Sequence, residues 1–200
     1  MTVPVLPAVP PGTRLLGITG APGVGKSTVA AFLGLPVVPM DGFHYADVEL
    51  VRRGLLDRKG APETFDAEGY AALLRRVRAG EEDVVAPMFE RDLEQPLAGA
   101  IFVPPTGTVV TEGNYLLLDD PRWRAVRETL DVVWHLVTDD AARLERLVAR
   151  HVAFGKTPDE ARAWVVRVDE ANARPVEAAR ERADAVVDVT AWAPRRTPPA

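Results

Sequence analysis

The chain has 200 residues, of which 47% are hydrophobic and 26% are charged, and its formal net charge is −5. This length fits one domain with a sizeable core, and the acidic balance disfavours a nucleic-acid partner, because phosphate backbones select basic surfaces. The absence of cysteine excludes disulfides and thiolate chemistry and fits a cytoplasmic location. No apolar run approaches the roughly 20 residues of a membrane span, so no membrane partner is expected.

Five short apolar runs predict five buried strands. None of them alternates strictly between apolar and polar residues, which favours a parallel sheet covered on both faces. Helix-like segments separate the runs, so the sequence predicts a doubly wound α/β fold. The expected strands are residues 15–19, 37–40, 108–111, 132–137 and 185–189.

Four helices are expected between these strands, each with a recognisable start or stop signal. Asp and Thr side chains accept hydrogen bonds at helix N-termini, and glycine ends helices in a left-handed conformation. The expected helices run from the loop after Gly20 to Gly34, from the Asp66 cap over 70–79 to Gly80, from the Asp139 cap to Arg150, and from the Thr157–Glu160 capping box to about Arg174, where Pro175 should kink or end the helix.

The two ends of the chain differ in composition from the middle. Residues 1–12 carry four prolines and no basic residue, which favours an extended leader over a signal peptide. Residues 193–200 form a Pro-rich tail that is expected to fray. A single domain is therefore expected over residues 13–192.

The strongest motif follows the first expected strand. Residues 20–27 read G-A-P-G-V-G-K-S, which matches the phosphate-binding pattern G-x-x-x-x-G-K-[ST] in its required strand–loop–helix context. Glycines leave the backbone N–H groups free to surround phosphates, the lysine should reach the β- and γ-phosphates, and the serine hydroxyl should sit on Mg²⁺. The alternative is a glycine-rich turn with a surface lysine. The residues expected to bind ATP are Gly20, Ala21, Pro22, Gly23, Val24, Gly25, Lys26, Ser27 and Thr28.

Two acidic residues end other expected strands. Asp41 follows the second strand and Glu112 ends the third, and carboxyl ends of parallel strands form the ligand-binding edge of such sheets. Glu112 is expected to act through Mg²⁺ or its waters, or on the substrate, with a purely structural carboxylate as the alternative. The chain has no N-K-x-D or T-K-x-D segment and no LSGGQ-like segment, which disfavours a GTPase and a transporter ATPase.

Four segments in order resemble the phosphoribulokinase/uridine kinase/pantothenate kinase family. They are the phosphate loop, M-D-G-F-H-Y at 40–45, R-K-G-A-P-E-T-F-D at 58–66 and V-T-E-G at 110–113. The second and third look especially like pantothenate kinase, and the resemblance covers roughly residues 15–189. It implies a doubly wound parallel sheet with a small helical lid, and a homodimer as an expectation.

The resemblance also implies an acceptor side. Asp41 matches the family position beside the acceptor hydroxyl, where a carboxylate can orient the hydroxyl and accept its proton. The alternative is that Asp41 caps a turn before glycine. Five further residues are expected to contact the acceptor: His44, Tyr45, Arg58, Lys59 and Tyr115. The alternative is that they are only hydrogen-bonded or solvated surface groups.

A basic helix face resembles the family's lid, expected at about residues 143–160. Arg143, Arg146 and Arg150 are spaced to share one helix face. A basic lid side chain can stabilise the charge on the transferring phosphoryl group, and Arg146 and Arg150 are the preferred candidates. The alternative is a solvated arginine face.

These features together predict an ATP-dependent kinase that phosphorylates a hydroxyl group of a small molecule. The catalytic residues would be Lys26, Asp41 and Glu112 with a lid arginine, and Ser27 and Glu112 would serve the metal. A nucleoside, pantothenate and a sugar such as fructose remain possible acceptors. The rival hypothesis is a nucleotide-dependent switch or assembly ATPase that acts on a protein partner.

Overall fold

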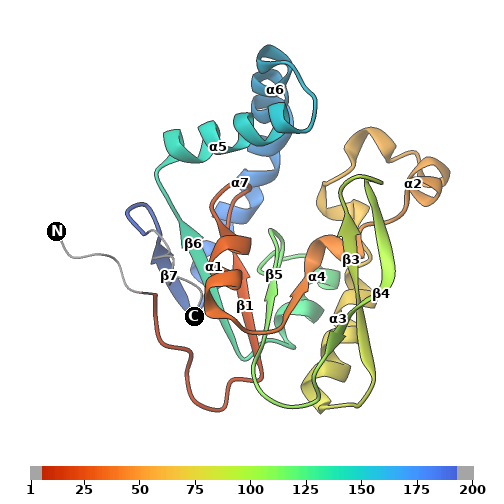
Figure 1. Ribbon diagram of the computed structural model, residues 1–200, viewed down its shortest axis with the longest axis vertical. Coiled ribbons are helices and arrows are strands. Elements are labelled where there is room, and N and C mark those ends of the chain that lie inside the picture. Colours follow the sequence, from red (N-terminus) through yellow and green to blue (C-terminus); the bar gives the residue numbers. More distant parts are fainter. Residues whose placement is uncertain (1–5, 193–200) are drawn as a thin grey trace, which may run out of the picture.

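A parallel sheet of five strands forms the centre of the computed structural model, which describes residues 6–192 (Figure 1). The strand order is β2-β5-β1-β6-β7, and every neighbouring pair is parallel. This confirms the predicted strands and fold class, with strand ends shifted by at most one residue. The strands are β1 (Leu15–Thr19), β2 (Val37–Pro39), β5 (Val109–Glu112), β6 (Val132–Val137) and β7 (Ala185–Asp188).

Helices cover both faces of the sheet. One face is closed by α1, whose Val29 and Ala30 pack with Ile18 and Leu136. The opposite face is closed by α3, α4 and α7, whose Leu74, Trp123 and Val176 belong to the larger core cluster. The helices are α1 (Lys26–Leu33), α2 (Asp47–Arg53), α3 (Ala67–Ala79), α4 (Pro121–Arg127), α5 (Asp140–Ala153), α6 (Pro158–Trp164) and α7 (Glu170–Ala178).

The predicted helix caps are present. The Asp66 carboxylate accepts from the backbone N–H of Gly69, and α3 ends at Gly80 in the left-handed conformation. Asp139 caps α5 in the same way, and Thr157 forms the full capping box of α6. Local side-chain chemistry therefore fixes where these helices begin.

Pro175 was expected to kink or end its helix, and the second of these outcomes is wrong. The chain stays helical from Pro158 to Ala178, through α6, a π-helical segment (Val165–Asp169) and α7. Proline inside a helix costs about 3 kcal/mol through the lost hydrogen bond and the ring clash. Here the following turn buries Val176 against the core, which offsets that cost.

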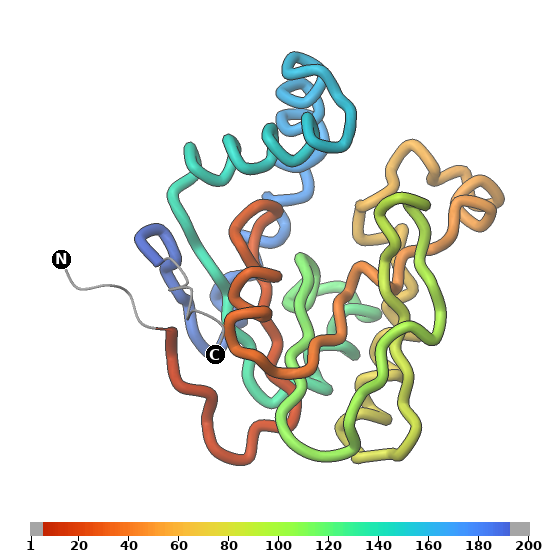
Figure 2. Tube along the Cα trace, viewed as in Figure 1, coloured from red at the N-terminus to blue at the C-terminus, as the bar shows by residue number. Residues whose placement is uncertain are grey.

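An antiparallel hairpin that was not predicted stands beside the sheet. It consists of β3 (Val84–Glu90) and β4 (Gln95–Val103) and packs on the 3₁₀ turn Met40–Phe43 that follows β2. Figure 2 shows the green hairpin running beside the orange segment that contains this turn and α2. The approach is close, since a Cβ at Gly42 would clash with the Pro87 carbonyl. The hairpin therefore forms one wall beside Asp41.

Both chain ends extend past the described residues. The expected Pro-rich tail, 193–200, and the first five residues of the expected leader lie outside them. Between residues 6 and 192, none of the helices combines the length and the apolar character needed to cross a bilayer.

Candidate active site

The phosphate loop connects β1 to α1 and has the backbone that the motif predicts. Gly20, Gly23 and Gly25 adopt φ angles of 145°, 79° and 107°, which favour glycine. At Gly23 a Cβ would also lie 2.7 Å from the Cγ of Leu147 in α5, so a side chain would not fit there. The loop therefore opens at the N-terminus of α1, where backbone N–H groups and the helix dipole attract anions.

The Lys26 ammonium lies at the mouth of this loop. Its Nζ donates to the carbonyl oxygens of Gly20 at 2.9 Å and Ala21 at 3.1 Å. Burial lowers the pKa of Lys26 to about 8, although the charges of Glu112 and Asp41 act in the opposite direction. Within residues 6–192 the lysine is thus a buried cation whose hydrogen bonds go to two neutral carbonyls, close to two carboxylates.

Ser27 and Glu112 form a pair of hard oxygen donors beside Lys26. The Ser27 hydroxyl donates to the Glu112 carboxylate across 3.1 Å. Burial raises the pKa of Glu112, and the nearby charge of Asp41 raises it further. A hydroxyl and a carboxylate oxygen are ligands that Mg²⁺ prefers, so these two residues fit the metal that phosphate-loop enzymes use.

Asp41 approaches the same point from the neighbouring strand. The sheet register pairs Glu112 with Ile18 of β1 on one side and with Pro39 of β2 on the other, so the ends of the three strands meet. Asp41 lies two residues beyond Pro39, and its charge acts on both Lys26 and Glu112. The structure therefore brings together the loop lysine and the two carboxylates that the sequence singled out.

His44 and Tyr45 lie next to Asp41 along the chain but make different contacts. His44 Nδ1 donates to the Asp41 carbonyl oxygen at 2.7 Å, and its ring packs on Phe65 and Phe89. Burial lowers the pKa of His44, which favours the neutral ring. The Tyr45 ring instead lies 4.3 Å from the guanidinium carbon of Arg53 in α2. His44 therefore braces the Asp41 turn, while Tyr45 faces α2.

The two basic residues expected on the acceptor side are both paired. Arg58 is exposed and forms an ion pair of 2.6 Å with Glu63. Lys59 forms an ion pair of 2.7 Å with Asp47 and donates to the Glu94 carbonyl in the hairpin turn. Neither points freely toward an acceptor. Lys59 instead ties α2 to the hairpin.

The expected acceptor contact Tyr115 is fully buried. Its side chain packs against Phe65 and Trp123, and its hydroxyl donates to the Gly60 carbonyl oxygen at 2.6 Å. Asn172 of α7 reaches the same carbonyl at 3.5 Å. Tyr115 thus holds the R-K-G segment at residues 58–60 in place through this hydrogen bond. Any effect of Tyr115 on an acceptor would pass through that segment.

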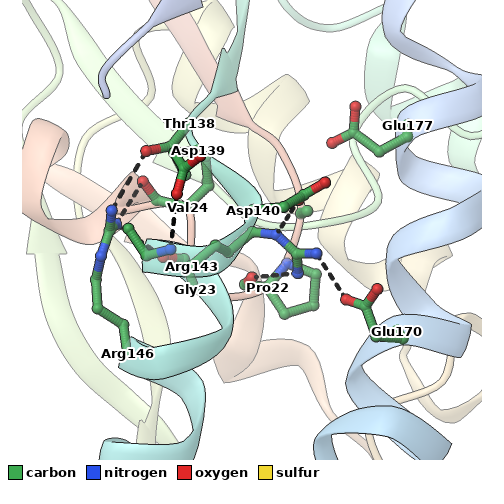
Figure 3. Close-up of polar contacts among 12 residues, drawn as sticks. Pro22, Gly23, Val24, Thr138, Asp139, Asp140, Arg143, Arg146, Glu170 and Glu177 are labelled. Atoms are coloured by element: carbon green, nitrogen blue, oxygen red, sulfur yellow. Dashed lines mark hydrogen bonds and ion pairs between the residues drawn. The ribbon is translucent and has the colours of Figure 1, made fainter. Parts of the chain in front are cut away.

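The arginines of α5 hold the phosphate loop (Figure 3). Arg143 is 5% exposed, and its guanidinium contacts Asp140 at 3.0 Å, Glu170 at 2.7 Å and the Pro22 carbonyl at 3.3 Å. All three ends of the fork are therefore used by protein groups. Arg143 connects the loop to both α5 and α7.

The two preferred lid arginines differ in how firmly they are held. Arg146 donates to the carbonyls of Gly23 at 3.1 Å and Val24 at 3.4 Å, as Figure 3 shows. Arg150 has only a long ion pair of 3.8 Å with Asp169, and its charge lowers the pKa of Lys26 after the larger effects of burial and the two carboxylates. Arg150 is thus the less firmly held of the two cations.

The sequence did not single out Arg91, which the structure places beside Asp41. Arg91 begins the hairpin turn and places its Nη2 3.5 Å from Asp41 Oδ2. The polar run R-D-L-E at 91–94, between two apolar runs, was the available signal for a hairpin turn. Nothing in the sequence connects this turn to a residue 50 positions earlier.

Several curated proteins are similar to the chain in sequence. The chain is 33% identical to the uncharacterized protein YggC of Escherichia coli over 84% of its own length and 75% of that protein's. It is 32% identical to the "Putative uridine kinase C227.14" of Schizosaccharomyces pombe over 70% and 67%. It is 34% identical to a pantothenate kinase of Limosilactobacillus reuteri over 62%, but spans only 44% of that protein. No family model matches the chain.

A solved structure extends the agreement to three dimensions. A "putative fructose transport system kinase" from Silicibacter sp. TM1040 is 43% identical to this chain and superposes on it with a TM-score of 0.78. The match covers 90% of this chain and 92% of that one. The fold, the phosphate loop and these relatives identify a P-loop kinase of small molecules. The chain belongs to the phosphoribulokinase/uridine kinase/pantothenate kinase family.

Proposed function

We propose that this protein transfers the γ-phosphoryl group of Mg·ATP to a hydroxyl group of a small molecule. The observation that carries the proposal is the convergence of Lys26, Glu112 and Asp41 at the ends of three adjacent strands. A switch or assembly ATPase also needs a loop lysine and a metal-side carboxylate. It has no use for a further carboxylate that faces an acceptor.

The nucleotide would bind with its phosphates in the loop at residues 20–27. Lys26 is held by two carbonyl oxygens, at 2.9 and 3.1 Å, and can exchange them for the more strongly accepting β- and γ-phosphate oxygens. Ser27 and Glu112 would hold Mg²⁺, which neutralises phosphate charge when it is bound. Both ligand groups already lie within hydrogen-bonding distance of one another.

Asp41 would act on the acceptor. It orients the hydroxyl, whose oxygen forms a new bond to the γ-phosphorus while its proton passes to the Asp41 carboxylate. The bond between that phosphorus and the oxygen bridging to the β-phosphate breaks, and ADP leaves with the electron pair. Because phosphoryl transfer has a loose transition state, positioning matters more than the strength of the base.

Residues 143–160 would serve as the lid. Figure 1 shows α5 and α6 standing beyond the strand ends, on the same side of the sheet edge as the phosphate loop. Arg150 is the first candidate for a phosphate contact, because its single ion pair of 3.8 Å is easily exchanged. Arg146 is the second, because it already bonds the loop carbonyls. Lid closure would exclude water and limit ATP hydrolysis.

A sugar is the first acceptor class to test. The solved structure that matches nine-tenths of this chain at 43% identity carries a fructose-related name. Pantothenate and a nucleoside follow, because the other named relatives point to them. All three acceptor classes carry a hydroxyl group that Asp41 could orient.

The test is an ADP-release assay with the purified chain, Mg·ATP and fructose, pantothenate or uridine in turn. We expect one acceptor to raise ADP formation well above the acceptor-free rate and to gain the mass of one phosphoryl group. Lys26→Ala serves as the inactive control. If ADP formation responds to an added protein partner and to none of the small molecules, the switch hypothesis replaces this one.

Further proposals concern the location, domain organisation and assembly of the protein. We propose a cytoplasmic enzyme with one domain over residues 13–192, as the lack of cysteine and the continuous fold suggest. A homodimer is the expected assembly, and sedimentation equilibrium checks it. Nucleic acid and membranes are not expected partners.

A further inference from the structure

A cationic side chain stands beside the acceptor carboxylate without a firm partner of its own. Arg91 is half-exposed at the hairpin turn, and its contact with Asp41 is one N–O approach of 3.5 Å. Other arginine ion pairs nearby are much shorter, 2.6 Å for Arg52 and for Arg58. Most of the donor groups of Arg91 therefore lack a partner among the described residues, yet the guanidinium faces the reaction centre.

The position of Arg91 is defined by its surroundings. The hairpin packs on the Asp41 turn, and the guanidinium carbon lies 5.9 Å from the centre of the Phe89 ring. Lys59 Nζ also lies near this ring, 5.6 Å from its centre. An aromatic surface restricts the guanidinium without using its hydrogen-bond donors.

Nearby groups are less able to bind an anion. Lys59 is paired with Asp47 and with a hairpin carbonyl, and Arg58 is paired with Glu63. His44 is packed between aromatic rings, and its Nδ1 donates to a backbone carbonyl. Among these acceptor-side cations, Arg91 is therefore the one that can exchange its partner at little cost.

We infer that Arg91 binds an anionic group of the acceptor, so that the natural acceptor is an alcohol carrying a carboxylate or a phosphate. The inference rests on the proposed kinase function and narrows its acceptor class. A guanidinium offers a planar fork that matches both carboxylate and phosphate oxygens. Because Arg91 and Asp41 are neighbours, the anion on Arg91 would lie close to the hydroxyl that Asp41 orients.

The exchange would also release the catalytic carboxylate. In the structure Arg91 partly neutralises Asp41, which lies near the second carboxylate, Glu112. An anionic acceptor offers Arg91 a better-matched partner and leaves the Asp41 oxygens to the hydroxyl. A neutral acceptor would have to bind with Arg91 still competing for Asp41. The enzyme should therefore bind anionic acceptors in preference to neutral ones.

Matched pairs of acceptors test the inference. Pantothenate is compared with its neutral alcohol pantothenol, and fructose 6-phosphate with fructose, so that the carboxylate and phosphate cases are separated. Wild type should favour the anionic member of one pair. Arg91→Gln should lower kcat/KM for that member by about 10- to 100-fold, the usual worth of a charged hydrogen bond, and should change the neutral member by less than about threefold. Arg91→Lys should retain part of the selectivity.

Binding measured directly keeps the test independent of turnover. Calorimetric titration of each acceptor into the ADP complex is repeated with Arg91→Gln and with the control Arg52→Gln, which removes an exposed arginine paired with Glu49. The inference is overturned if neither anionic member binds wild type better than its neutral partner, or if Arg91→Gln weakens both members equally. Failure of the kinase proposal looks different, since selective binding would persist without any phosphorylated product.

Discussion

The nucleotide side and the acceptor side of this site are built in different ways. On the nucleotide side, residues 20–28 are consecutive, and their function resides mostly in backbone conformation. On the acceptor side, Asp41, Lys59, Arg91 and Tyr115 come from four separate segments joined by side-chain contacts. One side is a local structure, and the other exists only after the chain has folded.

This difference predicts how each side responds to change. Backbone N–H groups bind any triphosphate in the same way, so the loop fixes how the nucleotide phosphates bind and offers little room for variation. Side-chain contacts on the acceptor side can be exchanged one at a time without disturbing the loop. Related kinases can therefore share the phosphate chemistry and differ in acceptor, as the names of the relatives indicate.

Substitution of Lys26 tests the nucleotide side most severely. Lys26→Ala should lower kcat by about 10³-fold, because a preorganised charge at the transferring phosphate is lost. The melting temperature should report separately on the loss of the two hydrogen bonds that Lys26 donates to the Gly20 and Ala21 carbonyls. Initial rates of ADP release at saturating acceptor, with a thermal melt alongside, give both values. A variant that retains more than a tenth of the activity would contradict the assigned role.

Substitution of Asp41 tests the point where the two sides meet. Asp41→Asn should lower kcat by about 10²-fold, the usual worth of a positioned proton acceptor. The Kd for ADP should stay within about twofold, because the proposed role of Asp41 is to contact the acceptor and not the nucleotide. Single-turnover rates and ADP titration separate the two effects. Unchanged turnover in Asp41→Asn would remove this carboxylate from the mechanism.

The pH dependence of nucleotide affinity sharpens the comparison. Lys26 has a pKa lowered to about 8 by burial, so the free protein loses this charge as the pH rises through that value. Bound phosphates should keep the lysine protonated, so ADP affinity should fall about tenfold between pH 7 and 9. Calorimetry in two buffers of different ionisation enthalpy should show proton uptake near pH 8. Lys26→Ala should show neither effect.

The sequence was informative where structure is set locally. The five strands were predicted from apolar runs, and the caps at Asp66, Asp139 and Thr157 were predicted from side chains that bond within three residues. The hairpin escaped prediction because Pro87 and Pro96 interrupt its strands and much of β4 is exposed, so neither run looks like a buried strand. At Pro175 the alternative of a helix end was wrong, because tertiary burial of Val176 outweighed the local signal.

The candidate site, like the fold, was predictable where it depends on local sequence and not where it depends on tertiary packing. The loop motif singled out Lys26 and Ser27 as candidates, and the strand ends singled out Asp41 and Glu112, since parallel strands bring their carboxyl ends together. The partners of Arg58 and Lys59, and the approach of Arg91 to Asp41, depend on how the hairpin and α2 pack. No spacing rule relates residues that meet only through such packing.

Tyr115→Phe is the mildest test and separates the two sides. The change removes one buried hydrogen bond to the Gly60 carbonyl, which should cost about 1 kcal/mol of stability. The R-K-G segment should loosen and raise the acceptor KM by about threefold while the ATP KM stays constant. Tyr70→Phe is the matched control, because its hydroxyl bonds Thr111 away from that segment. Equal rises in both KM values for Tyr115→Phe would show that the acceptor side and the nucleotide side are coupled more tightly than their separate construction implies.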